Sequence, residues 1–136
     1  MSNLIFLFLV TFTSFVLNQA CKQNQVVIMN ELGPNRILEF HCYSNKDDLG
    51  IKTMGFQGTP YTIRFHDEIP NLTRWNCILR QGANMEYSFD VQMYKAGPRL
   101  IPRCGQLRIW SARLDGIYFA RKANTPLVRA LSWNKK

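Results

Sequence analysis

Apolar and polar residues alternate over several short stretches of the chain, and a period of two is the pattern of β-strands that bury one face. Two apolar runs, at residues 26–29 and 117–119, and apolar positions within 107–109 and 127–133 add further strand candidates. The expected inward positions are Leu38, Phe40 and Cys42; Tyr61, Ile63 and Phe65; Trp75, Cys77 and Leu79; and Met85, Tyr87, Phe89, Val91 and Met93.

Turn-forming residues separate these stretches. The Gly33-Pro34-Asn35 turn predicts a hairpin between residues 26–29 and 36–43, and Asp115-Gly116 predicts a tight turn before residues 117–119. No window of helical length keeps a 3.6-residue period. About eight short strands joined by turns are typical of an antiparallel sandwich or barrel, and we predict an all-β fold, a small antiparallel β-sandwich.

The N-terminus carries an apolar stretch that begins at Leu4 and continues to Leu17, and the first charged side chain is Lys22. A membrane span needs about 20 apolar residues, and polar residues from Thr11 onward make this stretch too short and too polar to be an anchor. We therefore predict a signal peptide at residues 1–20, although no Lys or Arg precedes the apolar stretch; the alternative is a buried N-terminal strand. The remaining residues, 21–136, suffice for one secreted, extracellular domain without a stable membrane anchor.

The four cysteines are Cys21, Cys42, Cys77 and Cys104, and all would remain after cleavage before Cys21. An even number in a small exported domain indicates two disulfides. Three pairings are possible, of which we favour Cys42 with Cys77 and Cys21 with Cys104. Cleavage after Cys21 would leave one thiol without a partner. No pair has the CxxC spacing, so we expect no structural metal site.

The chain is basic, with 17 Lys and Arg against 9 Asp and Glu and a formal net charge of +8. This charge is compatible with an acidic or polyanionic partner, and equally with a solvated surface that keeps the protein soluble. A nucleic-acid partner is not expected, because the chain lacks a basic helix and an obvious stacking motif.

Candidate catalytic residues are few. His66, Asp67 and Glu68 could form an acid and base cluster, but adjacent polar residues at a turn are usually solvated. His41 is expected to be an exposed or hydrogen-bonded histidine of a sheet, and residues 45–48 lack the ligand spacing of a calcium loop. No hydrolase, metalloprotease or nucleotide-binding motif is present, so we predict no catalytic residues, no cofactor and a binding module instead of an enzyme.

One glycosylation sequon is present, at Asn71-Leu72-Thr73. It follows the Pro70 turn, where a surface position is expected, and an exported chain could carry a glycan on Asn71. A bare turn asparagine is the alternative.

Several landmarks together resemble the plant self-incompatibility protein family, the S-protein homologs. They are Phe40-His41-Cys42, Asp47-Asp48-Leu49-Gly50, Trp75-Asn76-Cys77, Arg103-Cys104, Trp110 and Asp115-Gly116-Ile117-Tyr118, and they span the whole mature chain in order. The family pattern places a second cysteine two residues before the tryptophan, a position that Arg108 occupies here. The departure suggests that Cys104 pairs with Cys21 instead of a local partner.

The resemblance implies a secreted, disulfide-stabilised β-sandwich and offers no active site to transfer. Some members act as pistil ligands recognised by a pollen receptor, so a plasma-membrane receptor protein is the expected partner. Contacts are expected in the loop segments 44–48, 66–74 and 96–103, because loop side chains are free of packing. The alternative is a basic defence or cell-wall-binding protein. The receptor, the biological process and the oligomeric state are not determined by the sequence.

Overall fold

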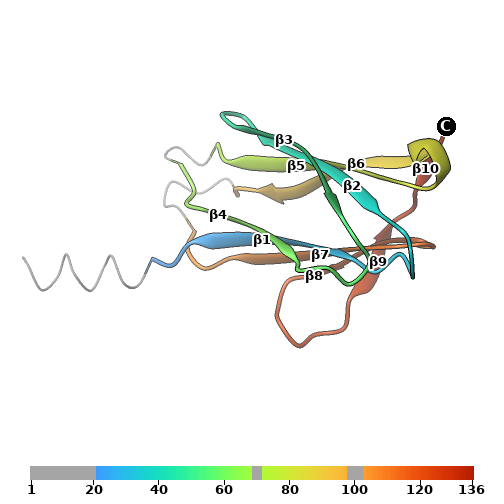
Figure 1. Cartoon of the computed structure of the whole chain (residues 1–136). Helices are drawn as coiled ribbons and strands as arrows, with labels where there is room; N and C mark the ends of the chain where they lie inside the picture. The colour runs from blue at the N-terminus through green and yellow to red at the C-terminus, as the bar shows by residue number, and fades with distance from the viewer. Residues whose placement is uncertain (1–20, 69–71, 98–102) are drawn as a thin grey trace, which may run out of the picture.

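The chain folds into two five-stranded β-sheets packed face to face (Figure 1), and a computed structural model describes residues 21–68, 72–97 and 103–136. The first sheet has the order β4 (Tyr61–Phe65), β1 (Asn24–Asn30), β7 (Leu107–Arg113), β8 (Gly116–Ala120) and β9 (Val128–Leu131). The second has the order β10 (Asn134–Lys135), β6 (Tyr87–Lys95), β5 (Arg74–Gln81), β2 (Leu38–Ser44) and β3 (Asp48–Met54). A 3-10 turn, η1 (Ala83–Met85), precedes β6.

The predicted all-β sandwich is confirmed, with two differences in detail. The described residues form ten strands instead of about eight. The predicted stretch 127–133 contains β9 of one sheet, and the short β10, in the other sheet, follows that stretch. Seven of the eight strand pairings among the described residues are antiparallel, but β1 and β7 run parallel. The proposed signal peptide at residues 1–20 lies outside the described residues.

The predicted hairpin across Gly33-Pro34-Asn35 is wrong. β1 pairs with β4 and β7, whereas β2 pairs with β3 and β5, so the turn carries the chain from one sheet to the other. Asn30, which is 2% exposed, stabilises this crossing: its amide donates to the carbonyls of Arg36 (3.1 Å) and Met54 (2.8 Å), and its oxygen accepts the N–H of Leu32 (2.9 Å). A buried amide thus supplies the hydrogen bonds that a hairpin ladder would have made.

The core lies between the two sheets and follows the predicted alternation in most strands. Met85 is an exception, because it lies in η1 with a positive φ of 52° and not at the start of β6. In β7 the inward positions are Arg108, Trp110 and Ala112, while Leu107 and Ile109 are half-buried. The buried apolar residues include Val26, Ile28, Leu38, Phe40, Ile63, Trp75, Leu79, Val91, Met93 and Ile117.

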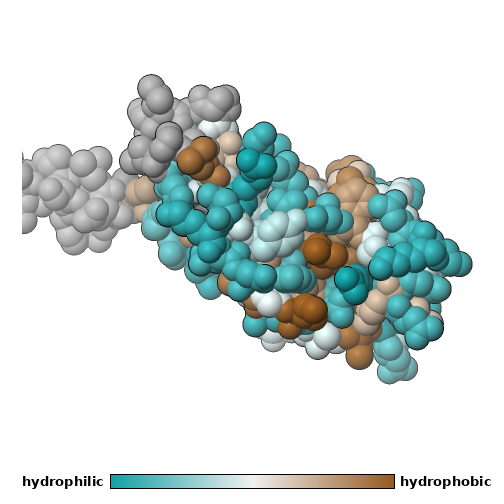
Figure 2. Space-filling view, turned by 90° about the horizontal axis from the view of Figure 1, so that it is seen from above, coloured by the Kyte–Doolittle hydropathy of each residue, from teal (hydrophilic) through white to brown (hydrophobic). Residues whose placement is uncertain are grey.

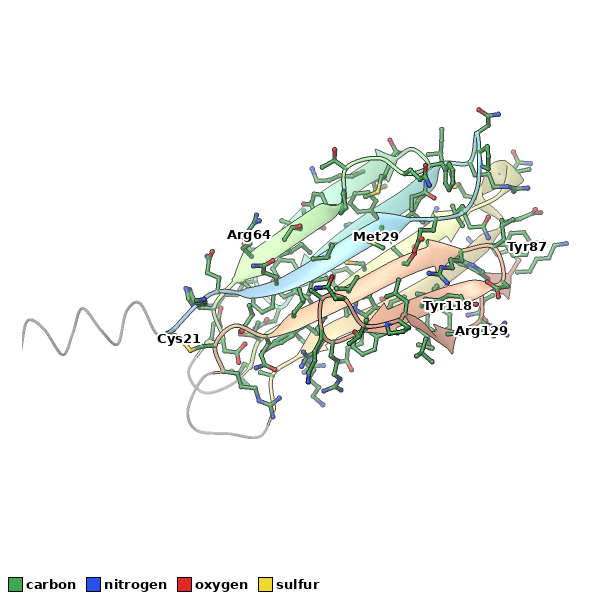
Figure 3. The ribbon with its side chains drawn as sticks, turned by 90° about the horizontal axis from the view of Figure 1, so that it is seen from below. Cys21, Met29, Arg64, Tyr87, Tyr118 and Arg129 are labelled. Carbon is green, nitrogen blue, oxygen red and sulfur yellow. A yellow bond between two sulfur atoms is a disulfide. The ribbon has the colours of Figure 1, made fainter. Side chains whose placement is uncertain are left out.

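Two disulfides close the sandwich in the pairing that the sequence favoured. Cys42 joins Cys77 between the neighbouring strands β2 and β5, where the two residues are opposite in register. Cys21 joins Cys104, and this bond attaches the residues before β1 to those before β7. In Figure 3 Cys21 lies at the end of the molecule where β1 begins. No cysteine of the described residues is free.

Candidate contact surface at one end of the sandwich

The loops that the sequence proposed as contact segments gather at one end of the sandwich. The described parts of the connections from β2 to β3, from β4 to β5 and from β6 to β7 all lie at the end drawn on the left in Figure 1, which we call the contact end. The described parts of these segments are residues 44–48, 66–68 with 72–74, and 96–97 with 103. The Gly33-Pro34-Asn35 turn and η1 lie at the opposite end.

Asp67 connects this end to the core. Its Oδ1 accepts the Asn24 amide (3.0 Å) and the Tyr94 hydroxyl (2.7 Å), and its Oδ2 accepts the backbone N–H of Arg103 (3.1 Å). The expectation that residues 66–68 form a solvated cluster is therefore wrong for Asp67, which is 8% exposed. A buried carboxylate requires such donors to offset its lost hydration.

Asn24 and Tyr94 complete this buried network. Asn24 is fully buried, and besides Asp67 it contacts the Arg103 carbonyl (3.2 Å) and the Gln106 N–H (2.9 Å). Burial, together with the hydrogen bond to Asp67, raises the pKa of Tyr94 well above its ordinary value. The network joins β1, β6, the residues after β4 and the residues before β7, so the described parts of two of the three segments are fixed to both sheets.

Thr73 holds the middle segment in place. Its hydroxyl accepts the backbone N–H of Glu68 (2.8 Å), and its carbonyl accepts the N–H of Ala96 (2.9 Å). Thr73 is buried, whereas its neighbour Leu72 is 60% exposed. Asn71, the glycosylation candidate, lies outside the described residues.

An ion pair at the surface joins segment 44–48 to segment 66–68. Lys46 Nζ lies 3.2 Å from Glu68 Oε1. Beside this pair, a concavity of about 380 Å³ is lined by Tyr43, Ser44, Asn45, Arg74 and Asn76. The lining combines one cation with hydroxyl and amide groups, a composition suited to contacting a polar protein surface.

Tyr43 belongs to a polar cluster on the outer face of the second sheet. Its hydroxyl donates to Asp90 Oδ2 (2.7 Å), and Asn76 Nδ2 donates to Asp90 Oδ1 (3.2 Å). The hydrogen bond to Asp90 is the main cause of a raised pKa at Tyr43. The three side chains come from β2, β5 and β6 and present a fixed donor and acceptor pattern.

The two histidines occupy different settings. His41 Nε2 lies 2.6 Å from Asp48 Oδ1 across the β2–β3 pair, so the predicted hydrogen-bonded sheet histidine is confirmed. The pKa of the Asp48 carboxyl is lowered, first by the Gly50 N–H that it accepts and then by His41. His66 is exposed next to the buried Asp67. The carboxylate of Asp67 already accepts three hydrogen bonds, so it is not free to pair with His66.

One face of the molecule is mostly polar. Figure 2 shows hydrophilic side chains over most of the visible face, with apolar ones in separate places. Within the residues that the structure describes, no three His, Cys, Asp or Glu side chains are grouped to hold a metal ion. The same part of the chain contains no helix long and apolar enough to cross a membrane.

Sequence reasoning missed the buried polar residues that organise this end. Asn24 precedes the β-branched run, and Arg108 lies in the strand of Leu107 and Ile109, where its inward position was not anticipated. The signal that could have indicated Arg108 is Trp110, because residues two apart in a strand share a face.

Two disulfides, two packed sheets and loops gathered at one end define the class: a small disulfide-stabilised β-sandwich protein. The sequence profile of the family described as plant self-incompatibility protein S1 matches residues 25–133. The chain belongs to this family, as the sequence landmarks predicted.

Relatives and a solved structure agree with this membership. S-protein homolog 30 of Arabidopsis thaliana is 74% identical over 129 residues, covering 93% of this chain and 99% of the relative. S-protein homolog 25 of the same plant is 67% identical over 135 residues, covering 99% of each chain. A solved structure of a self-incompatibility protein homologue has a TM-score of 0.68 and 38% identity, covering 86% of this chain and 99% of that one. That structure represents a widespread family of small, highly stable, secreted plant proteins. This protein is accordingly secreted.

Proposed function

We propose that the protein is an extracellular signalling ligand, and not an enzyme, that binds a receptor protein in the plasma membrane. The observation that supports this most is the gathering of three loop segments at one end. Asp67 and Thr73 tie the described parts of two segments to the core, and the Lys46–Glu68 ion pair joins the third segment to them. Loops held on a rigid scaffold are a common means of recognition. Fixed loops also lose little conformational freedom on binding, which favours affinity.

A hydrolase that uses His66 with Asp67 or Glu68 is the less favoured hypothesis. The Asp67 carboxylate accepts three hydrogen bonds within the fold, and Glu68 is paired with Lys46. A general base needs an accessible acceptor within reach of the proton that it removes. We therefore assign Asp67 a structural role.

Two processing steps belong to the same proposal. Residues 1–20 are removed as a signal peptide, which leaves Cys21 to pair with Cys104. Asn71 of the Asn71-Leu72-Thr73 sequon carries a glycan. The exposure of its neighbour Leu72 supports this step.

Binding to plant plasma-membrane vesicles tests the location of the contact surface. Lys46→Glu and Arg74→Glu reverse charges at the contact end, and Arg36→Glu makes the same change in an exposed residue at the opposite end. We expect the first two variants to bind at least about tenfold more weakly, because a reversed charge at an interface costs several kcal/mol. Arg36→Glu should bind like the wild type. Equal binding by all three variants would place the contact surface elsewhere.

A basic defence or cell-wall-binding protein remains the second candidate, favoured by the net charge of +8. Such binding should fall steeply with salt and show little selectivity, because the Debye length shrinks from about 30 Å at 0.01 M to about 3 Å at 1 M. Receptor binding should instead retain its selectivity for one membrane protein at high salt. Comparing the two conditions separates the candidates.

A further inference from the structure

A pocket of about 310 Å³ opens between the two sheets, beside the C-terminal half of β6. Residues of β6 from Gln92 to Lys95 form one side of it. Trp110 of β7 and Phe119 of β8, from the other sheet, form the opposite side. The pocket therefore lies along the open side of the sandwich and reaches the contact end at Arg103.

The pocket holds four cations: Lys95, Arg103, Arg108 and Arg121. No carboxylate in the described part of the chain lies within 4.0 Å of their charged nitrogens. Asp67 contacts only the backbone N–H of Arg103, whose side-chain Nε is buried and without a hydrogen-bond partner. A buried donor left unpaired is costly, and a bound acceptor would relieve that cost.

Arg108 is the most enclosed of the four cations and is 8% exposed. Its guanidinium donates to the Leu107 carbonyl (2.9 Å) and to Gln106 Oε1 (3.4 Å), both neutral acceptors. Burial lowers the pKa of Arg108, and the neighbouring charge of Arg121 lowers it further. The charge of Asp67 offsets part of this effect on the Arg108 pKa, but the carboxylate of Asp67 is already bonded to three donors, so the four cations outnumber the negative charge near them.

Aromatic rings and a close backbone approach lie against the three guanidinium groups of the pocket. The Arg108 guanidinium carbon lies 5.5 Å from the centre of the Tyr94 ring, and that of Arg121 lies 5.8 Å from the centre of the Phe119 ring. A Cβ atom at Gly97 would lie 2.8 Å from an Arg103 side-chain nitrogen, so the glycine leaves the space that this guanidinium occupies. Planar guanidinium groups held in this way are suited to carboxylates.

The neighbouring edge of β6 lacks a strand partner along most of its length. β10 pairs only with Tyr87 and Ser88, and no other described strand pairs with this edge. The Met93 carbonyl is taken by the Trp110 indole (3.2 Å). Among the described residues, the rest of this edge has no strand partner, and a free strand edge is where a sheet can take up an added strand.

We propose that the cationic pocket and the free edge of β6 together bind an extended acidic peptide. Its backbone adds to β6 beyond β10, and its carboxylate side chains enter the pocket. The inference rests on the proposed function in one respect: it identifies the receptor segment that this ligand recognises as acidic and extended. An acidic saccharide shares the carboxylate but lacks the peptide groups that complement a strand edge, so the free edge favours a peptide.

Direct binding to the wild-type protein is tested with three probes. They are an eight-residue capped peptide of alternating threonine and glutamate, the same peptide with glutamine at each glutamate, and an oligogalacturonate of matched charge. Charged hydrogen bonds predict that the glutamate peptide binds at least about tenfold more tightly than the glutamine peptide. Equal affinities for the two peptides, or tighter binding of the oligogalacturonate, would overturn the proposal.

Matched variants locate the site. Arg121→Gln removes one positive charge from the pocket, and Arg64→Gln removes one from β4, at the opposite edge of the first sheet (Figure 3). Both residues are exposed, so both variants should fold. Affinity for the glutamate peptide should fall about tenfold in Arg121→Gln and stay unchanged in Arg64→Gln. Equal losses in the two variants would indicate an effect of net charge alone and would overturn the proposal.

The same variants on membranes separate this proposal from the receptor proposal. If wild-type protein binds saturably to plasma membranes and Arg121→Gln binds equally well, the acidic-peptide site is wrong and the receptor function stands. If wild-type protein shows no saturable binding although the glutamate peptide binds, the receptor function is wrong and the peptide site stands. Saturable binding by the wild type that is weakened in Arg121→Gln supports both.

Discussion

The contact end depends on a few buried polar residues, and Asp67 is central among them. It accepts hydrogen bonds from Asn24, Tyr94 and Arg103, which belong to segments far apart in the sequence. Each bond joins a loop to the core, and each donor is buried or partly buried. Removal of the carboxylate would leave several of these donors without a partner, which costs more than the hydrogen bonds contribute when made.

Asp67→Ala should lower the free energy of unfolding by about 3 kcal/mol, since unpaired buried donors cost about 1 to 3 kcal/mol each. Glu68→Ala is the matched control, because its carboxylate makes a surface ion pair with Lys46 that contributes about 1 kcal/mol or less. Denaturant unfolding of the two variants measures both values. A loss below about 1 kcal/mol in Asp67→Ala would contradict the assigned role.

Tyr94 makes folding stability depend on pH in the alkaline range. Because its pKa is raised in the folded state, the folded protein holds this proton more tightly than the unfolded chain. The stabilisation is complete below the ordinary tyrosine pKa of about 10 and is lost as the pH rises above it, by at most about 1.4 kcal/mol per pH unit.

Tyr94→Phe should therefore reduce the slope of stability against pH above about pH 10. Tyr43 and Tyr118, whose pKa values are also raised by carboxylate partners, remain in this variant and retain part of the slope. Unfolding measured from pH 8 to pH 11 tests this, and an unchanged slope in Tyr94→Phe would contradict the account.

At the scale of the elements, the strands were predictable and their partners were not. Alternation places Leu38, Phe40 and Cys42 on the buried face, as observed, because period two is a local property of a strand. The hairpin across residues 33–35 was mispredicted because the same turn residues serve a hairpin and a crossing between sheets. What distinguishes them is the pairing of buried Asn30 with Arg36 and Met54, which depends on tertiary structure.

The candidate site was also predictable only in part, because local patterns locate loops but do not show which side chains tertiary structure buries. Loops between strands can be located from turn residues, so the three segments were found. The buried positions of Asp67 and Arg108 could not be found, because polar residues are ordinarily expected at the surface. The parallel pairing of β1 with β7, which aligns Gln25 with Leu107, likewise brings together residues far apart in the chain.

Gly116 allows β8 and β9 to approach closely, because it has no Cβ atom. It has a positive φ of 156°, and an added Cβ atom would lie 2.6 Å from the Leu131 carbonyl oxygen. Gly116→Ala should therefore destabilise the fold by more than about 1 kcal/mol. Gly55→Ala is the control, since nothing lies within 4 Å of its Cβ position and its φ is not in the left-handed region. Similar unfolding free energies for the two variants would contradict this reading of the β8–β9 contact.

At the scale of the whole molecule, the N-terminal boundary determines the number of disulfides. Removal of residues 1–20 keeps Cys21, which pairs with Cys104 over a sequence separation of 83 residues. Closing so long a loop stabilises the fold by about 4 to 5 kcal/mol on the chain-entropy model. Mass spectrometry of the secreted protein should find a mature chain that starts at Cys21 with no free thiol. A mature N-terminus beyond Cys21 would contradict the predicted boundary.

The basic surface and the polar contact end have separate consequences for binding. The net charge of +8 speeds association with acidic partners and is weakened by salt. On the receptor proposal, groups at the contact end such as Arg74 and the hydrogen-bonded Tyr43–Asp90 pair are expected to provide selectivity that salt weakens less. The proposed ligand is therefore expected to combine fast capture by its receptor with a specific fit.

Saturation binding of the labelled, oxidised protein to plant plasma-membrane vesicles tests the receptor proposal most directly. We predict saturable binding that unlabelled protein displaces and that protease treatment of the vesicles abolishes. Non-saturable binding, or binding that survives protease treatment and disappears in high salt, would contradict the account and favour a cell-wall or lipid surface.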